Sequence, residues 1–275
     1  MIKRISRRLR RILVREGEPT VTGAAVTPLV HRTTHTSEDT DFYTPLLAGA
    51  ATIFPRLSGA SVVREVMDVL GRLTPDRYSE FLMKFYGEGL SRFGEDWQYA
   101  DINTVLLGLS RDFKLQSYME IGVRRGRSMA MVAAKSPTCS MVGFDLWIQN
   151  YAGMENPGKE LVRSELQRVG FHGSLEFVDG DSAATVPAFF MAHPDAYFDV
   201  VTVDGDHSLE GARRDITNVT PRIKIGGGLV FDDISHHYHT ALGPLWKEIV
   251  VNNPHFSTVS FDDVGFGVGL GIRKF

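Results

Sequence analysis

From residue 117 to the end of the chain, short apolar runs alternate with stretches of helical periodicity, and this alternation limits the fold more than any other feature. Five runs rich in β-branched and aromatic residues are separated by four segments with apolar residues at three- and four-residue steps. The runs are residues 117–122, 139–147, 174–180, 198–205 and 226–233. Repeated strand–helix units of this kind predict a parallel sheet covered by helices on both faces.

The C-terminus departs from this pattern. Residues 256–261 and 265–275 are two further apolar runs, and a short Asp-rich loop joins them. Such a pair predicts an antiparallel hairpin at the edge of the sheet. The predicted fold class is therefore α/β, a doubly wound sheet that is mostly parallel and ends in an antiparallel hairpin.

The chain has 275 residues, which is enough for one large α/β domain with an extension. Residues 46–115 contain three amphipathic helical segments, and the Thr-Pro-Asp sequence at 74–76 supplies a helix start between the first two. We expect these residues to form a helical N-terminal extension or lid. The main domain is predicted over residues 116–275, and a basic arm with a poorly ordered linker over residues 1–45.

Residues 1–18 carry seven basic and two acidic side chains, a net charge of +5, so the remainder of a chain of net charge −3 carries −8. Apolar residues at helical spacing make this arm a candidate amphipathic helix. Two interpretations stay open: an arm that contacts a membrane surface or RNA, and a solubilising helix that docks on the protein itself or frays. His31 and His35, in the linker, are predicted to be solvated.

Composition excludes several other classes of protein. The single cysteine, Cys139, allows no internal disulfide and fits a reducing cytoplasm. No window approaches the roughly 18 uninterrupted apolar residues that a membrane span needs. The acidic remainder of the chain disfavours a nucleic-acid substrate, because backbone phosphates would be repelled. Homo-oligomerisation through the N-terminal helices stays open.

Each of the five predicted parallel strands ends in a carboxylate. One such acid is often only a helix cap, but five at the same edge of a sheet indicate a site. Ligands of open α/β sheets bind beyond the carboxyl ends of the strands. We therefore expect a cationic or polyhydroxylated ligand, with a metal ion as a further component. The strand ends are Glu120, Asp145, Asp179 to Asp181, Asp204 to Asp206, and Asp232 with Asp233.

The turn after the first strand reads EIGVRRGRS, residues 120–128. Gly122 and Gly126 allow a tight turn and close approach to a ligand, and the helix starting near Ser128 offers free N–H groups. A dinucleotide fingerprint would have a glycine where Arg124 stands, and the preceding Glu120 suits an ammonium group better than a pyrophosphate.

Two later strand ends extend this candidate cofactor site. Asp145, 25 residues after Glu120, is placed to take both hydroxyls of a ribose. Asp181 and Ser182, after the third strand, are candidates for the adenine edge, although Ser182 is equally a candidate helix cap.

With these residues in view, the sequence from about residue 97 to residue 275 resembles the class I S-adenosylmethionine-dependent methyltransferases. It looks most like the metal-dependent O-methyltransferases that act on macrolide sugars, the macrocin and mycinamicin type. The resemblance implies a Rossmann-like, seven-stranded sheet whose last strand is antiparallel. It implies S-adenosylmethionine as cofactor, and it places five of the residues above around that cofactor: Glu120, Gly122, Gly126, Asp145 and Asp181.

Asp204 ends the fourth predicted strand, and Asp232 with Asp233 ends the fifth. Neighbouring strand ends lie about 5 Å apart, so the three carboxylates can converge on one point. They would repel one another unless a divalent cation neutralised them, and oxygen-only ligands favour Mg²⁺. The alternative is that Asp232 or Asp233 caps a helix while Asp204 holds a loop amide.

His207 follows Asp204 by three residues, and macrolide-sugar relatives carry a histidine at this position. A neutral imidazole can accept a proton near pH 7, so His207 and Asp204 are the predicted catalytic residues. The sequence SHHYH, residues 235–239, suggests zinc, but adjacent histidines cannot easily share one tetrahedral site. A loop on the substrate side and a solvated loop both stay open.

The predicted function is methyl transfer from S-adenosylmethionine to a hydroxyl of a small molecule, with Mg²⁺, in natural-product biosynthesis; a sugar hydroxyl is the acceptor that the resemblance suggests. One alternative is a metal-independent methyltransferase with Asp204 or His207 as base. Another is a non-catalytic binding protein on the same fold. A nicotinamide dehydrogenase is disfavoured by the missing dinucleotide fingerprint.

Overall fold

A computed structural model describes residues 32–37, 46–150, 153 and 155–275 of the chain. The predicted basic arm, residues 1–18, lies outside the described residues, as does most of the predicted linker. Within the described residues, no helix is both long and apolar enough to cross a membrane.

The centre of the fold is one seven-stranded sheet with the strand order β3-β2-β1-β4-β5-β7-β6. Five neighbouring strands pair in parallel, and β7 is antiparallel to both of its neighbours, β5 and β6. The predicted doubly wound sheet with an antiparallel C-terminal hairpin is therefore confirmed. The strands are β1 (Ser117–Ile121), β2 (Ser140–Asp145), β3 (Leu175–Asp179), β4 (Phe198–Val203), β5 (Ile223–Asp232), β6 (Phe256–Phe261) and β7 (Val268–Arg273).

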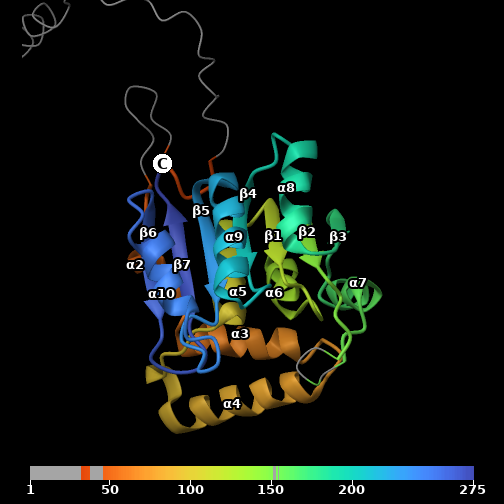
Figure 1. The fold of residues 1–275 in the computed structure, drawn as a ribbon. Helices are drawn as coiled ribbons and strands as arrows, with labels where there is room; N and C mark the ends of the chain where they lie inside the picture. Colours follow the sequence, from red (N-terminus) through yellow and green to blue (C-terminus); the bar gives the residue numbers. More distant parts are fainter. Residues whose placement is uncertain (1–31, 38–45, 151–152, 154) are drawn as a thin grey trace, which may run out of the picture. The chain divides into compact units, whose positions relative to one another are not determined.

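Helices cover both faces of this sheet (Figure 1). The period-two alternation of a strand sends Tyr118 to one face and Met119 to the other, and the two residues belong to separate apolar clusters. The Tyr118 cluster includes α5 (Ile102–Phe113), α6 (Arg127–Lys135) and α7 (Lys159–Arg168). The Met119 cluster includes α8 (Ser182–Ala192), α9 (Leu209–Val219) and α10 (Leu242–Trp246).

The N-terminal extension packs on the same core. Its elements include α2 (Ala50–Ile53), α3 (Ala60–Leu70) and α4 (Arg77–Phe93). Asp76 begins α4 with a reciprocal cap: its carboxylate accepts the Ser79 N–H, and the Ser79 hydroxyl accepts the Asp76 N–H. The predicted helix start at 74–76 is therefore confirmed. In Figure 1, α4 runs across the lower end of the sheet, below α3.

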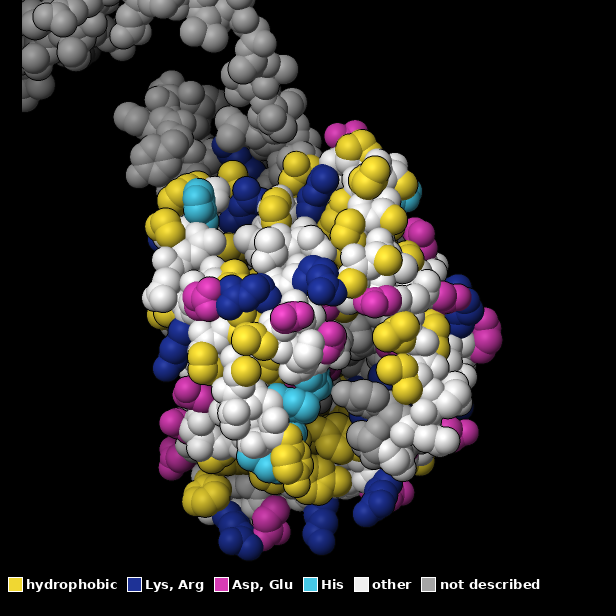
Figure 2. All heavy atoms as spheres, in the orientation of Figure 1, with side chains coloured by type: hydrophobic (Ala, Val, Ile, Leu, Met, Phe, Trp, Pro, Cys, Tyr) yellow, Lys and Arg dark blue, Asp and Glu magenta, His cyan; other side chains and the backbone are white. Residues whose placement is uncertain are grey.

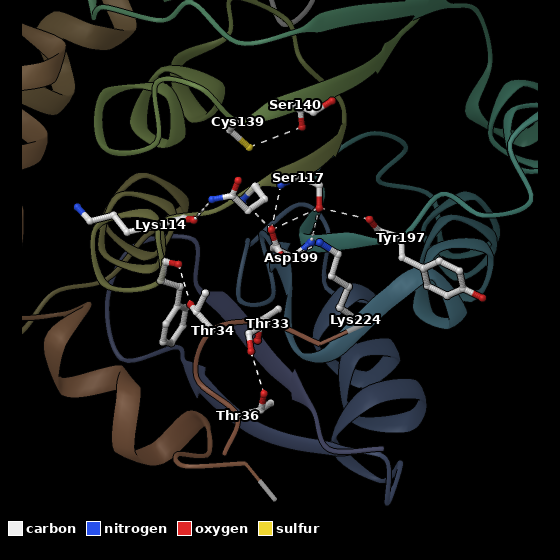
Figure 3. Close-up of polar contacts among 12 residues, drawn as sticks. Thr33, Thr34, Thr36, Lys114, Ser117, Cys139, Ser140, Tyr197, Asp199 and Lys224 are labelled. Atoms are coloured by element: carbon white, nitrogen blue, oxygen red, sulfur yellow. Dashed lines mark hydrogen bonds and ion pairs between the residues drawn. The ribbon is translucent and has the colours of Figure 1, made fainter. Parts of the chain in front are cut away.

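A buried polar network joins the opposite, amino-terminal ends of three strands (Figure 3). The Asp199 carboxylate on β4 accepts the backbone N–H groups of Gln116 and Ser117 at 2.7 and 2.9 Å. It also accepts a hydrogen bond from Lys224 Nζ on β5, at 2.9 Å. Asp199 is 5% exposed, so this network neutralises a buried charge and fixes β1, β4 and β5 together.

Residues 32–36 pack against the same end of the sheet. Arg32 forms a parallel bridge to Ile225, and the Thr33 N–H donates to the Ile225 carbonyl at 3.1 Å. His35 is 7% exposed and stacks on Phe113 with ring centroids 4.4 Å apart. The prediction of a solvated His35 is wrong, because a ring that packs on α5 is removed from water by a contact distant in sequence.

Candidate active site

A cavity of about 680 Å³ lies at the carboxyl ends of the parallel strands. Figure 2 shows histidine side chains gathered beside hydrophobic ones near the end of the molecule that α4 crosses. The lining comes from the turns after β1 to β5, from α4, and from the loop that precedes β7. The predicted site residues among it are Gly122, Ser128, Asp145, Asp181, Ser182, Asp204, His207, Asp232 and Asp233.

Backbone geometry explains both glycines of the first turn. Gly122 has a φ of +92°, and a Cβ there would lie 1.9 Å from the Asp204 carbonyl oxygen. Gly126 has a φ of +70° and precedes α6, where a Cβ would lie 2.5 Å from Val162. The chain therefore needs glycine at 122 so that the ends of β1 and β4 can approach each other. Gly126 lies outside the cavity lining and acts on it through the position of α6.

Asp145 holds the first turn in place. One carboxylate oxygen accepts the Arg124 N–H at 2.6 Å, and the other accepts the Trp147 N–H. Arg124 itself has a φ of +52°, so the turn follows a left-handed path at a non-glycine residue. Each carboxylate oxygen has a second lone pair, which leaves Asp145 able to accept further hydrogen bonds from a ligand in the cavity.

Asp181 is the N-cap of α8 and accepts the Ala183 N–H at 2.8 Å. Ser182 is the first residue of that helix. The ordinary capping role thus falls to Asp181, and both side chains still line the cavity. Their predicted contact with an adenine edge stays a prediction.

Glu120 lies beneath the cavity and outside its lining, with no exposed surface. Tyr118 donates to one carboxylate oxygen at 2.5 Å, and Ser128 donates to the other. Burial, together with the nearby charges of Asp204 and Asp145, raises the pKa of Glu120 to about 8 despite these two donors. Glu120 therefore lies under the site as a carboxyl group that favours its neutral form.

The three predicted metal-binding aspartates all line the cavity, but among the described residues the group whose ligand atoms lie within 4.8 Å of one another is His207, Asp233 and His239. Burial raises the pKa of Asp232 well above its usual range, and the charges of Asp204 and Asp233 raise it further. Burial and the Asp204 charge raise the pKa of Asp233 to about 7. The folded protein thus disfavours the charged forms of Asp232 and Asp233, and a divalent cation beside these carboxylates would offset that penalty.

His207 lies between two of these aspartates. Its Nε2 is 3.2 Å from Asp204 Oδ1, and its Nδ1 is 3.7 Å from Asp233 Oδ2. Burial opposes the charged imidazolium, but the hydrogen bond and charge of Asp204 outweigh burial and raise the pKa of His207. Nδ1 is buried and has no hydrogen-bond partner among the described residues.

The N-terminal extension provides one wall of the cavity, of which the sequence analysis named no individual residue. Tyr78, Phe81 and Phe85 follow one another along α4 and line the cavity, with Tyr99 and Asp101 beside them. Phe81 is 55% exposed. The three- and four-residue spacing of these aromatic residues was the available signal, but the same spacing also fits an ordinary core face.

A further group of lining residues comes from the loop after β5. His236 and His239 both line the cavity, whereas His237 is exposed and lies outside the lining. The predicted substrate-side position of this loop stays a prediction, although the structure places two of its histidines at the cavity.

The comparisons with known proteins agree with this geometry. Residues 119–234 match a protein family described as a methyltransferase domain. A search of curated proteins gives no match.

Several solved structures are similar to this chain at low sequence identity. The SAH-bound methyltransferase PaMTH1 of Podospora anserina has a TM-score of 0.50 and 12% identity, over 78% of this chain and 88% of that one. Cofactor-bound Rv0187 from MTB has a TM-score of 0.49 and 18% identity, over 80% and 89% of the two chains. The O-methyltransferase TomG of Streptomyces achromogenes, in complex with SAM, has a TM-score of 0.47 and 18% identity, over 63% and 79%.

The matched residues 119–234 run from β1 to the turn after β5 and include every strand end that lines the cavity. The PaMTH1 comparison supports the fold of the sheet around them. The part of the chain that lines the cavity is thus similar to a methyltransferase domain, which is the domain of an enzyme.

Proposed function

We propose that the enzyme transfers a methyl group from S-adenosylmethionine to a hydroxyl of a small molecule, with the help of a divalent cation. The observation that carries the proposal is the convergence of Asp204, Asp232, Asp233 and His207 on one cavity at the carboxyl edge of a methyltransferase sheet. Its volume of about 680 Å³ falls within the range of roughly 300 to 1,000 Å³ typical of small-molecule sites.

The cofactor end of the cavity is the half formed by the ends of β1, β2 and β3. The turn at Gly122 brings backbone close to a ligand, and Asp145 can accept from ribose hydroxyls while it holds that turn. Asp181 and Ser182 line the cavity and are the proposed contacts to the adenine edge. Ser128 N–H belongs to the first turn of α6, a favourable position for a carboxylate.

The acceptor end is the half formed by β4, β5 and the α4 wall. Asp204, Asp232 and Asp233 are the carboxylates available to a divalent ion, which would lower the pKa of a substrate hydroxyl. Nδ1 of His207 is the free ring nitrogen in this half and is the proposed proton acceptor, while Asp204 holds the opposite nitrogen. The aromatic side chains of α4 would exclude water and orient the acceptor.

The substrate class follows from the mixture of groups around the acceptor end. Carboxylates and a histidine suit an acceptor with several hydroxyls, and the aromatic wall suits an apolar body. A hydroxylated natural product, such as a sugar on a macrolide, combines several hydroxyls with an apolar body. The proposed setting of the methylation is the cytoplasm. A metal-independent methyltransferase is the second candidate, because His207 already has an orienting carboxylate without any ion.

Calorimetric titration of S-adenosylmethionine into metal-stripped protein, repeated with Mg²⁺, tests the proposal. Wild type, Asp204→Ala and His207→Ala are each expected to bind the cofactor with similar affinity, since neither substitution touches the turn at Gly122. Turnover of hydroxylated acceptors should fall by at least about 100-fold in both variants. Absence of cofactor binding in wild type would contradict methyl transfer, and normal turnover in His207→Ala would remove the proposed base.

A further inference from the structure

The loop after β5 turns two of its histidines toward the same point. Asp233 has a φ of +61°, and two successive turns follow: His236 N–H donates to the Asp233 carbonyl at 3.1 Å, and His239 N–H donates to the His236 carbonyl at 3.0 Å. His236 and His239 then both line the cavity, whereas the intervening His237 is exposed and lies outside the lining. The objection that adjacent histidines cannot share a site therefore does not apply to the pair at 236 and 239.

His239 meets His207 and Asp233 across the cavity. One ligand atom from each of the three residues lies within 4.8 Å of the other two. The rings of His207 and His239 are 4.5 Å apart between centroids. Two imidazoles and one carboxylate thus converge from three different chain positions, the turn after β4, the end of β5 and the loop that follows.

His207 is already held as a metal-binding histidine usually is. A ligating imidazole generally donates its second ring N–H to a carboxylate, which fixes the tautomer and the direction of the free nitrogen. Here Nε2 is 3.2 Å from Asp204 Oδ1, and the buried Nδ1 faces Asp233 without a hydrogen bond to any described residue.

We propose that His207 Nδ1, His239 and Asp233 bind a divalent transition-metal ion such as Zn²⁺ or Co²⁺, with Asp204 as the carboxylate that orients His207. Imidazole ligands favour the later first-row metals, whereas Mg²⁺ requires near-octahedral oxygen coordination. With three protein ligands, such a site leaves a position for water or a substrate oxygen.

This site overlaps the proposed acceptor end without depending on it, because metal binding can be measured without cofactor or acceptor. The ion would occupy the same nitrogen that is proposed to accept a proton. A bound transition metal should therefore inhibit methyl transfer, unlike Mg²⁺ on the carboxylates. The histidine-rich loop would in this way make the enzyme sensitive to transition metals.

The test is titration of Co²⁺ into metal-stripped, full-length protein, followed by its visible d–d absorption, with Zn²⁺ and Mg²⁺ as competitors. Wild type should develop intense bands typical of four- or five-coordinate nitrogen and oxygen ligation. Zn²⁺ should remove them at stoichiometric amounts, and Mg²⁺ should leave them unchanged in large excess. His239→Ala should bind Co²⁺ at least about tenfold more weakly. His237→Ala, one exposed histidine of the same loop, is the matched control and should bind as wild type does.

Thermal unfolding of metal-free protein checks that His239→Ala is folded, and His239→Gln serves as a second variant if it is not. Equal Co²⁺ affinity in wild type and His239→Ala, or displacement of Co²⁺ by equimolar Mg²⁺, would overturn the proposal. The proposed methyl transfer is judged separately, by cofactor titration and turnover in Mg²⁺.

Discussion

Glu120 illustrates what one buried carboxyl group can and cannot do. Its strand-end position suggested a direct contact with the cofactor, yet the side chain lies under the cavity and is held by Tyr118 and Ser128. Strand alternation explains this, because a side chain at the last pleat of β1 points into one face of the sheet rather than beyond its edge. Its link to the cavity runs through the hydroxyl of Ser128.

Glu120→Gln should stabilise the protein at pH 8 relative to wild type. The pKa of Glu120 is about 8 in the folded protein against 4.5 for an unperturbed glutamate, so the folded state binds more protons between these values. As the pH rises from about 4.5 through 8, the free energy of unfolding of wild type therefore falls by on the order of a few kcal/mol through this group. Glutamine does not ionise, so the variant does not lose this stability. Denaturant unfolding of both proteins at several pH values measures the difference, and parallel profiles of unfolding free energy against pH would contradict the prediction.

At the scale of elements, α4 connects the two ends of the cavity. Its N-cap, Asp76, forms ion pairs with Arg125, in the turn that follows β1, at 3.1 Å and with Arg127, the first residue of α6, at 2.7 Å. The guanidinium of Arg127 also lies over the Tyr78 ring, 5.1 Å from its centroid. The helix that forms the aromatic wall is thus fixed to the turn of the proposed cofactor site.

Asp76→Asn tests this connection. Asparagine can still cap α4, but Arg125 and Arg127, with side chains 9% and 14% exposed, would lose their counterion. Breaking such a pair should cost about 3 kcal/mol in the free energy of unfolding and weaken cofactor binding. Glu95→Gln removes the exposed Arg64 pair and is the control, with no measurable change expected. Unfolding curves and cofactor titration measure the two effects. Equal stability of Asp76→Asn and Glu95→Gln would argue against a connection between α4 and the turn after β1.

The segment 32–36 is a second element whose role depends on its packing. Burial disfavours the charged imidazolium form of His35 and lowers its pKa to about 4, although the negative charge of Asp199 opposes this shift. Its ring nitrogen Nδ1 lies 2.9 Å from the Thr33 hydroxyl. His35 is therefore neutral when residues 32–36 pack against the sheet.

Acidification should lower the free energy of unfolding, because the folded protein holds His35 in its neutral form. The unfolded chain protonates His35 near pH 6.5 and the folded chain only near pH 4, so the unfolded state binds more protons in this interval and stability falls as the pH falls. The full loss from this group is about 3 kcal/mol. In His35→Gln the slope of unfolding free energy against pH between 6.5 and 4 should be shallower, by urea unfolding. An unchanged slope would mean that His35 titrates alike in both states.

At the scale of the whole molecule, the two edges of the sheet differ in how their acidic side chains are neutralised. The carboxyl edge collects acids that repel one another around the cavity, and the amino edge neutralises its buried acid internally. Asp199, Lys224 and two backbone amides satisfy one another there (Figure 3). Carboxylates that raise one another's pKa are thus concentrated at the edge that carries the cavity.

Asp199→Ala should separate stability from function. It would leave Lys224 and the two amide groups buried without an acceptor, at a cost of about 3 to 5 kcal/mol. The cavity lies at the opposite edge, so cofactor affinity per folded molecule should stay that of wild type. Thermal unfolding and calorimetry measure the two quantities. A loss of affinity with unchanged stability would be the reverse of this expectation.

The local sequence was enough to predict the sheet, its antiparallel hairpin, the start of α4 and the carboxylates at the strand ends. Periodicity and capping are set by neighbours within a few residues, and parallel strands bring their carboxyl ends to one edge whatever the loops do. For the same reason strand order was enough to place Asp204, Asp232 and Asp233 at the edge that carries the cavity.

Contacts between distant segments decided the rest. Whether Glu120 meets the cavity depends on Ser128 and Tyr118, and whether His35 meets water depends on Phe113. The direction of His239 depends on two turns after Asp233, which no periodicity records. Side-chain environment is a property of what packs across the fold, so burial, pKa and shared ligation became visible only in the tertiary structure, whereas the pattern of strands and helices was already determined by the sequence.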